Sequence, residues 1–166
     1  MDISSIIALA VILAASFATA MTAAVSRPGP WYAALDKPWW TPPNWLFPIA
    51  WSIMYALMSA SAFLVWRFAP PGEAFAPLSA YAIQLVLNGL WSPVFFRMQW
   101  MGLAYLVVVA MWVAILYTIV LFFQINYWAG LMMLPYLLWV TVASFLNLSV
   151  WRMNRGRTVH ADGTTA

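Results

Sequence analysis

The chain contains a run of 54 residues, Met98–Trp151, without a single charged side chain. As one continuous α-helix this run would be roughly 80 Å long, whereas the hydrocarbon core of a bilayer is about 30 Å thick. The run must therefore fold back on itself, and its turn-like stretch is Gln-Ile-Asn-Tyr-Trp-Ala-Gly at residues 124–130. This pattern predicts two membrane-spanning helices, at about residues 101–123 and 128–150.

Three further uncharged runs are each long enough to cross a bilayer, which takes about 20 mostly apolar residues. They predict helices at about residues 3–25, 45–66 and 77–96, so the chain has five spans. None of the spans alternates apolar and polar residues, which argues against a membrane β-barrel. We therefore expect an all-α membrane protein, a five-transmembrane-helix bundle. It forms a single domain over residues 1–151 and is followed by a polar tail at 152–166.

The composition excludes several classes of protein. Only 7% of the residues are charged, whereas soluble domains carry about 25%. The mean hydropathy is +0.86. A soluble domain, a nucleic-acid-binding protein and a disordered chain are therefore excluded, and the lipid bilayer is the expected surrounding.

The first span has a second interpretation, as a cleaved signal peptide, because Ala18-Thr19-Ala20 resembles a cleavage site. Two features favour a retained helix. Asp2 precedes the apolar run where a signal peptide carries Lys or Arg, and the run is longer than the usual apolar region of a signal peptide.

Basic residues are distributed unequally between the two sides of the membrane. Five spans put the termini on opposite sides, and the side of the N-terminus has Arg67 as its only Lys or Arg. The other side has six basic residues: Arg27, Lys37, Arg97, Arg152, Arg155 and Arg157. The positive-inside rule predicts that this second side, which holds the 26–44 loop and the C-terminus, faces the cytoplasm of an inner membrane.

The loop at residues 26–44 is long and unusually aromatic. Its five prolines and one glycine prevent a continuous helix. It nevertheless contains Trp31, Tyr32, Trp39 and Trp40, which a flexible linker would not. We expect the loop to pack as a lid against lipid headgroups or a pocket.

The tryptophans fall into two groups. Five lie at expected helix ends, as in the aromatic belt of a membrane interface: Trp45, Trp66, Trp100, Trp128 and Trp151. Four lie inside spans: Trp51, Trp91, Trp112 and Trp139. A buried indole N–H without an acceptor costs on the order of 1–3 kcal/mol, so each interior tryptophan needs a protein acceptor, a water or a ligand.

Three of the interior tryptophans lie on polar and aromatic helix faces. The residues at helical spacing are Pro48, Trp51 and Tyr55; Gln84, Asn88, Trp91 and Phe95; and Pro135, Trp139, Ala143 and Asn147. Four of them belong to the half of the bilayer where the aromatic loop emerges: Trp51, Asn88, Trp91 and Asn147. This predicts a pocket for a large, flat, mostly apolar ligand. The alternative is that the amides join helices and the aromatic side chains only pack. Spacing alone does not choose between the two.

The sequence contains no recognisable catalytic or metal-binding set. It has no cysteine, its only histidine is His160 in the tail, and no acidic residue lies within a span. We therefore expect no metal site, no catalytic residues of the usual kinds and no required cofactor.

Several motifs resemble a known family. The segment Trp-Tyr-Ala-Ala-Leu-Asp-Lys-Pro-Trp-Trp-Thr-Pro-Pro at residues 31–43, followed by Phe47-Pro48 and Trp51, resembles the signature of the TspO/MBR family. This family contains the bacterial tryptophan-rich sensory proteins and the mitochondrial translocator protein, or peripheral benzodiazepine receptor. Further matching motifs are Asn88 with Trp91, and Pro-Tyr-Leu-Leu-Trp at 135–139 with Asn147. The resemblance covers about residues 5–152.

The resemblance implies a five-helix bundle, commonly a homodimer, that binds porphyrins such as protoporphyrin IX and haem. By motif position the ligand contacts would fall on Tyr32, Trp39, Trp51, Asn88 and Trp139, with Ala143 providing space. Together with the helix faces, this gives a ligand-binding set of Trp31, Tyr32, Trp39, Pro48, Trp51, Tyr55, Asn88, Trp91, Phe95, Trp139, Ala143 and Asn147. The leading hypothesis is a porphyrin-binding translocator or sensor linked to tetrapyrrole transport, regulation or stress response.

Two other functions and one departure from the family stay open. Porphyrin photo-oxidation, attributed to the family, would use Trp51 and Trp139 as redox-active residues. A non-catalytic dimeric scaffold would use small residues at four-residue spacing: Ala10, Ala14, Ala18 and Thr22, and also Ala76 and Ala80. The stretch at 147–152 lacks the tyrosine of the family's proposed cholesterol motif, which argues against sterol binding.

Overall fold

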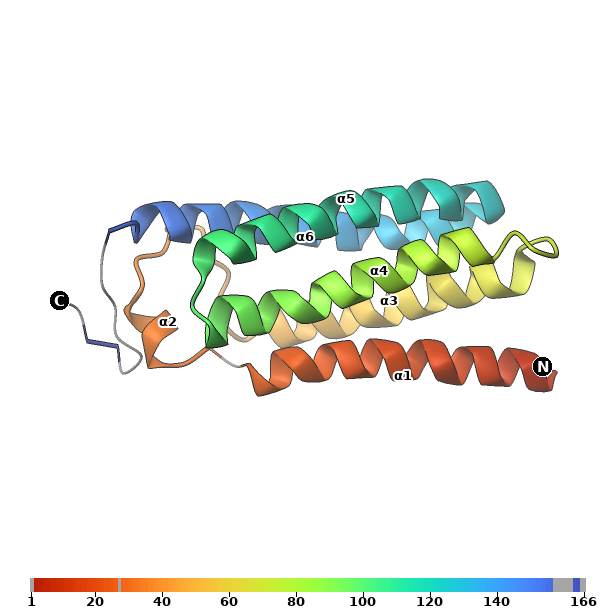
Figure 1. Cartoon of the computed structure of the whole chain (residues 1–166), viewed down its shortest axis with the longest axis horizontal. Coiled ribbons are helices and arrows are strands. Elements are labelled where there is room, and N and C mark those ends of the chain that lie inside the picture. The colour runs from red at the N-terminus through yellow and green to blue at the C-terminus, as the bar shows by residue number, and fades with distance from the viewer. Residues whose placement is uncertain (1, 27, 157–162, 165–166) are drawn as a thin grey trace.

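The computed structural model describes residues 2–26, 28–156 and 163–164. Its elements, in chain order, are α1 (Ile3–Val25), α2 (Pro30–Ala34), α3 (Leu46–Phe68), α4 (Phe75–Ser92), the π-helix η1 (Pro93–Arg97), α5 (Met101–Ile125) and α6 (Tyr127–Met153). Five segments are long and apolar enough to cross a membrane: α1, α3, α4 continued by η1, α5 and α6. Figure 1 shows these five running along the long axis of the molecule, with α2 at one end. The predicted five-helix membrane fold is confirmed.

Some helix ends differ from the sequence expectation. Helix α3 runs to Phe68 and α6 to Met153, each beyond the expected last residue. The turn expected between α5 and α6 shrinks to one residue, Asn126. The Asn126 side chain accepts a hydrogen bond from the Ala129 N–H at 3.1 Å. This cap satisfies one of the free N–H groups of the first turn of α6, so no longer loop is needed.

The order of the helices around the bundle is not their order in the chain. Helix α1 packs against α3 and α4, α4 against α5, α5 against α6, and α6 against α3. The ring is therefore α1–α3–α6–α5–α4. Because α3 starts, and α4 and α6 end, at the end of the bundle that carries α2, the polar faces predicted on these helices lie in the same half of the bundle (Figure 1).

Helix α1 is the least buried span, and small side chains allow it to approach the bundle. Its buried residues include Ser16 and Thr19. An added Cβ at Gly89 of α4 would lie 3.7 Å from methyl carbons of Thr19 and Thr22. Thr22, which belongs to the small-residue stripe suggested for dimer contacts, therefore serves contacts within one chain.

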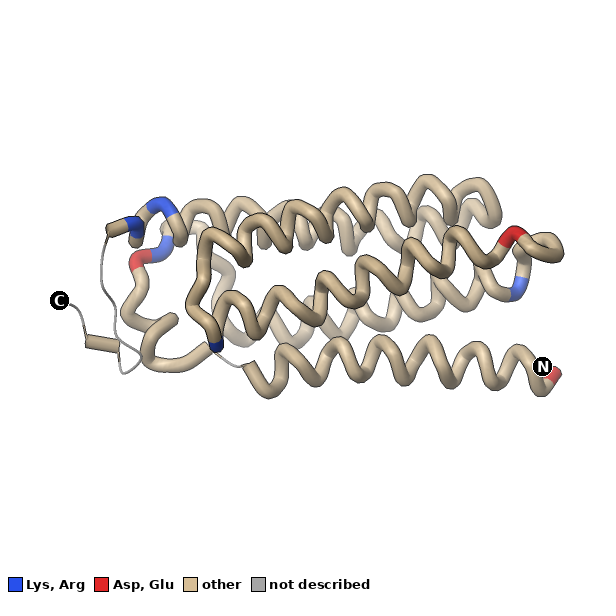
Figure 2. Tube along the Cα trace, viewed as in Figure 1, with Lys and Arg blue, Asp and Glu red and all other residues tan. Residues whose placement is uncertain are grey.

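Charged residues lie at the two ends of the bundle. Figure 2 shows Lys and Arg gathered at the end that carries α2, with a long uncharged stretch between the ends. Arg67 lies at the other end, close to the C-terminus of α3. Arg27, Arg157 and His160 lie outside the described residues. The structure thus separates the described basic residues as the sequence pattern predicted, while the side that faces the cytoplasm stays a prediction.

Candidate functional site

Residues 28–44, the described part of the aromatic loop, fold over one end of the bundle, and we refer to them as the lid segment. Within it, α2 buries Trp31 and Tyr32 with exposed fractions of 5% and 7%. The Tyr32 ring packs edge-to-face on Phe96 at 5.3 Å between ring centroids, and Trp31 packs on Phe95 at 5.8 Å. Burial raises the pKa of the Tyr32 hydroxyl. The lid segment is therefore held by aromatic packing on η1.

The π-helix η1 presents these aromatic side chains. Pro93 has no N–H, so the α-helical pattern of α4 cannot continue through it unchanged. The Met98 N–H instead donates to the Pro93 carbonyl, five residues back, at 2.9 Å. This widened turn directs Phe95 and Phe96 toward the lid segment, and both pack against Trp91 as well. Sequence reasoning selected Phe95 but missed Phe96 and the π-helix, for which Pro93 within a span was the available signal.

A second connection ties α4, α5 and α6 together beneath the lid segment. The Trp91 indole N–H donates to Asn147 Oδ1 at 3.0 Å, and Asn147 Nδ2 donates to the Met101 carbonyl at 3.0 Å. Trp91 and Asn147, which the sequence placed on separate helix faces, therefore meet. In the described structure their polar atoms are used for contacts between helices.

Deeper in the bundle, hydrogen bonds link three helices. Tyr55 of α3 donates to Asn88 Oδ1 at 2.8 Å, and Asn88 Nδ2 donates to the Tyr136 hydroxyl at 2.7 Å. Tyr136 in turn donates to Gln84 Oε1 at 3.0 Å. Tyr136 and Gln84 are fully buried. Tyr136 was missing from the predicted set, although its position three residues before Trp139 puts it on the same helix face.

The remaining aromatic residues of the set line the same region. Trp51 lies 5.7 Å from Tyr55 and 6.2 Å from Tyr136 between ring centroids. Trp139 packs edge-to-face on Phe47 of α3 at 5.8 Å. Ala143, one turn beyond Trp139, is half-buried, whereas Pro48 is exposed on α3. Trp51, Tyr55 and Asn88 thus meet around Tyr136. Trp139 packs against the same core cluster as Trp51 and Tyr55, and Pro48 is exposed.

Three interior tryptophans differ in what their indole N–H groups contact. Trp91 donates to Asn147, and Trp112 donates to Thr141 Oγ1 at 2.8 Å. The Trp139 Nε1 atom is buried and has no hydrogen-bond partner in the described structure. An orphaned N–H of this kind is uncommon in native proteins and marks a place where an acceptor from a ligand would be stabilising.

Trp39 occupies a different position from the other predicted residues. It is 96% exposed, and the neighbouring Trp40 packs against the buried lid cluster instead. A ligand contact for Trp39 stays a prediction, whereas Trp40 is an aromatic neighbour that the sequence-based set omitted.

Positive charge lies at the edge of the aromatic cluster. The Lys37 ammonium group sits over the Tyr32 ring, 4.7 Å from its centroid. It donates to the carbonyls of Leu35 at 2.9 Å and Ala33 at 3.2 Å. Burial lowers the pKa of Lys37, and the charge of Asp36 opposes this shift.

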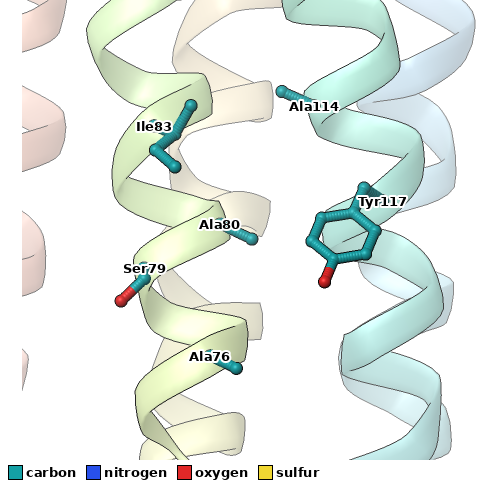
Figure 3. A pocket seen from close by; sticks show the side chains of 6 residues that line it. All are labelled: Ala76, Ser79, Ala80, Ile83, Ala114 and Tyr117. Atoms are coloured by element: carbon teal, nitrogen blue, oxygen red, sulfur yellow. The ribbon is translucent and has the colours of Figure 1, made fainter.

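Two grooves in the described part of the chain lie away from this region. One groove of about 170 Å³ is lined by Ala76, Ser79, Ala80, Ile83, Ala114 and Tyr117 of α4 and α5 (Figure 3). A second, of about 430 Å³, is lined by Trp66, Ala74, Phe75, Leu78, Ser79 and Ala82. None of the twelve predicted ligand contacts lines either groove. In the half of the bundle under the lid segment, the aromatic side chains instead pack against one another.

The described residues hold no group of three or more His, Cys, Asp and Glu side chains that could bind a metal ion. The described side chains of the site offer aromatic rings, amides and phenol hydroxyls. These groups bind flat ligands by stacking and orient them by hydrogen bonds.

Comparison with known proteins decides the family. The family model of the TspO/MBR family matches residues 6–152. The chain is 45% identical to Protein CrtK of Rhodobacter capsulatus over 153 residues, and this alignment covers 92% of this chain and 96% of that protein. It is 46% identical to the Tryptophan-rich sensory protein of Cereibacter sphaeroides over 145 residues, and this alignment covers 87% of this chain and 90% of that protein.

The chain belongs to the TspO/MBR family. The similarity extends to the human Translocator protein, at 37% identity over 128 residues and 76% of each chain. This TspO/MBR protein is thus an integral, multi-pass membrane protein of the sensory and translocator type. Its matched region, residues 6–152, includes all twelve predicted ligand contacts.

Proposed function

We propose that this protein binds a porphyrin, such as protoporphyrin IX or haem, beneath the lid segment, and that it acts in tetrapyrrole transport, regulation or stress response. The observation that carries the proposal is the buried indole N–H of Trp139, which has no acceptor among the described residues. Leaving such a group unpaired costs about 1–3 kcal/mol, and a ligand that supplies an acceptor recovers part of this cost. A porphyrin such as protoporphyrin IX or haem is flat and largely apolar, and its propionate groups are carboxylate acceptors.

The surrounding residues support a flat ligand. Phe47 and Trp139 come from α3 and α6, and Trp51 lies on the same two-helix contact beside Tyr136. These four aromatic rings offer stacking surfaces for a ligand. Each offset or edge-to-face ring pair stabilises a complex by about 0.5–1.5 kcal/mol beyond the burial of apolar area. Because the rings pack on one another in this structure, binding requires that they separate and that the lid segment moves.

Titration with protoporphyrin IX tests the proposal. Saturable quenching of tryptophan fluorescence is expected for the wild-type protein in lipid nanodiscs. Trp139→Phe removes the unpaired N–H and should weaken binding about tenfold, since one hydrogen bond is worth about 1 kcal/mol or somewhat more. Trp112→Phe is the matched control, because the Trp112 N–H is already paired with Thr141. Equal affinities of the two variants would contradict the assignment of the site.

A second candidate function is light-driven degradation of the porphyrin. Its motivating observation is that the Trp51 ring lies within 6.2 Å of the rings of Tyr55 and Tyr136, whose hydroxyls both hydrogen-bond to Asn88. Such a cluster suits transfer of an oxidising equivalent between rings. Under illumination in air, wild type should form a discrete coloured product, and Trp51→Phe should retain binding but lose the product. Unspecific bleaching in both proteins counts against this function.

The same proposal includes an orientation in the membrane. Lys37 lies in the lid segment, Arg97 ends η1, and Arg152 and Arg155 lie at the C-terminal end of α6, whereas Arg67 lies near the C-terminus of α3 at the opposite end. By the positive-inside rule, the lid end faces the cytoplasm of an inner membrane. The porphyrin would then reach its site from the cytoplasmic side.

A further inference from the structure

The C-terminal end of α6 makes a two-point contact with the lid segment. The Asp36 N–H donates to Asn154 Oδ1 at 3.0 Å, and Asn154 Nδ2 donates to the Asp36 carbonyl at 2.9 Å. One side-chain amide therefore pairs with both backbone groups of one lid residue, 118 positions away in the chain. Asn154 is only 2% exposed, so water does not compete well for these bonds.

The amide is held in place by its own helix. Asn154 Nδ2 also donates to the Val150 carbonyl at 2.7 Å, within the last turn of α6. This third bond orients the amide plane, so that its oxygen and nitrogen face the N–H and the carbonyl of Asp36. Asparagine has the length and the donor–acceptor pair for this arrangement.

The contact lies next to the apolar attachment of the lid segment. Leu35, directly before Asp36, is 4% exposed and belongs to the buried cluster with Trp31, Tyr32 and Phe95. Packing on η1 holds one side of the lid segment, and Asn154 ties the following peptide to α6. Because apolar contacts are non-directional while hydrogen bonds require a specific geometry, the amide determines the position in which the lid segment closes.

We propose that Asn154 is a positioning residue that latches the lid segment to α6 and thereby sets how fast a ligand enters and leaves the aromatic site. The latch concerns the protein alone; the effect on ligand exchange rests on the proposed porphyrin binding. Helix α6 also carries Tyr136, Trp139 and Asn147. The latch therefore joins the lid segment to the helix that bears Trp139, whose buried indole N–H has no hydrogen-bond partner in the described part of the chain.

Hydrogen–deuterium exchange of the full-length protein in nanodiscs tests the latch without a ligand. Asn154→Ala removes the bonds to Asp36, and the peptide covering residues 31–40 should then exchange about tenfold faster, as expected from losing roughly 1–1.5 kcal/mol of hydrogen bonding. Asn154→Asp has the same shape but turns an acceptor toward two carbonyls, and it should act in the same direction. Peptides from α3 and α5 should be unchanged.

Asn126→Ala is the matched control. Asn126 caps the opposite end of the same helix, accepting from the Ala129 N–H, and is remote from the lid segment. It should leave exchange at 31–40 unchanged. The latch is refuted if Asn154→Ala and Asn154→Asp exchange like wild type in this peptide, or if Asn126→Ala accelerates it equally.

Stopped-flow quenching with protoporphyrin IX tests the second part. Asn154→Ala should raise the association and dissociation rates together, each about five- to tenfold, and change Kd less than about threefold, because a gate alters both directions equally. Unchanged rates, or a change in Kd through dissociation alone, would overturn the gating role. Absence of saturable quenching in wild type would instead refute the proposed function, and the exchange experiment would still decide the latch.

Discussion

Tyr136→Phe is the most informative single substitution in the bundle. Tyr136 is fully buried, and its hydroxyl accepts from Asn88 at 2.7 Å and donates to Gln84 at 3.0 Å. Phenylalanine keeps the ring and its packing on Trp51 but leaves an amide hydrogen of Asn88 and the carbonyl oxygen of Gln84 without these partners. The variant therefore isolates hydrogen bonding from packing.

The expected magnitude follows from the two orphaned groups. A buried polar group without a partner costs about 1–3 kcal/mol in soluble proteins, while hydrogen bonds between membrane helices average about 0.6 kcal/mol and reach about 1.7. Asn88 Oδ1 keeps its bond from Tyr55 at 2.8 Å, so part of the network survives. We expect Tyr136→Phe to lower the free energy of unfolding by about 2 kcal/mol, which is roughly a 30-fold change in the unfolding equilibrium.

Reversible unfolding in mixed detergent, followed by tryptophan fluorescence, measures this difference. Tyr117→Phe on α5 is the matched control, because Tyr117 is 58% exposed; it should differ from wild type by less than about 0.5 kcal/mol. Gln84→Met has nearly the same shape, and combined with Tyr136→Phe it removes the orphaned oxygen. The double variant should therefore lose less free energy of unfolding than the sum of the losses of the two single variants. A loss for Tyr136→Phe no larger than that for Tyr117→Phe would refute the reasoning.

Two further predictions concern packing and orientation. Gly130→Ala would bring a Cβ into a steric clash with the Phe123 ring at the tight contact of α5 and α6, and should destabilise the protein by about 1–3 kcal/mol. Gly89→Ala, whose Cβ would make ordinary 3.7 Å contacts, should be neutral or slightly stabilising in the same unfolding assay. Because the chain has no cysteine, Glu73→Cys and Arg155→Cys can be labelled singly in sealed vesicles. An impermeant maleimide should reach position 155 only from the cytoplasmic face and position 73 only from the other face.

Much of the candidate site was predictable from helical spacing. Asn88 and Trp91 share a face of α4, and Trp139 and Asn147 share a face of α6, because residues three and four apart are neighbours on a helix. The pairing of Trp91 with Asn147 was not predictable, since it depends on which helices are adjacent and on their rotation. The π-helix at 93–97 was missed for a related reason: Pro93 signals an irregularity, but the form it takes depends on packing with the lid segment.

By itself, the sequence determined that this chain is a bundle of five membrane helices, because uncharged runs of this length have few alternatives in a bilayer. Because residues at helical spacing share a face, the sequence also determined which residues form the polar face of each helix. Only the tertiary structure decided the ring order α1–α3–α6–α5–α4, the network centred on Tyr136, and the pairing of Asn154 with Asp36. It also distinguished Trp91 and Trp112, whose indole N–H groups have protein acceptors, from Trp139, whose N–H has none within the part of the chain that the structure describes. These features depend on contacts between residues far apart in the chain, where the match of shape and hydrogen bonding, rather than any local preference, selects the partner.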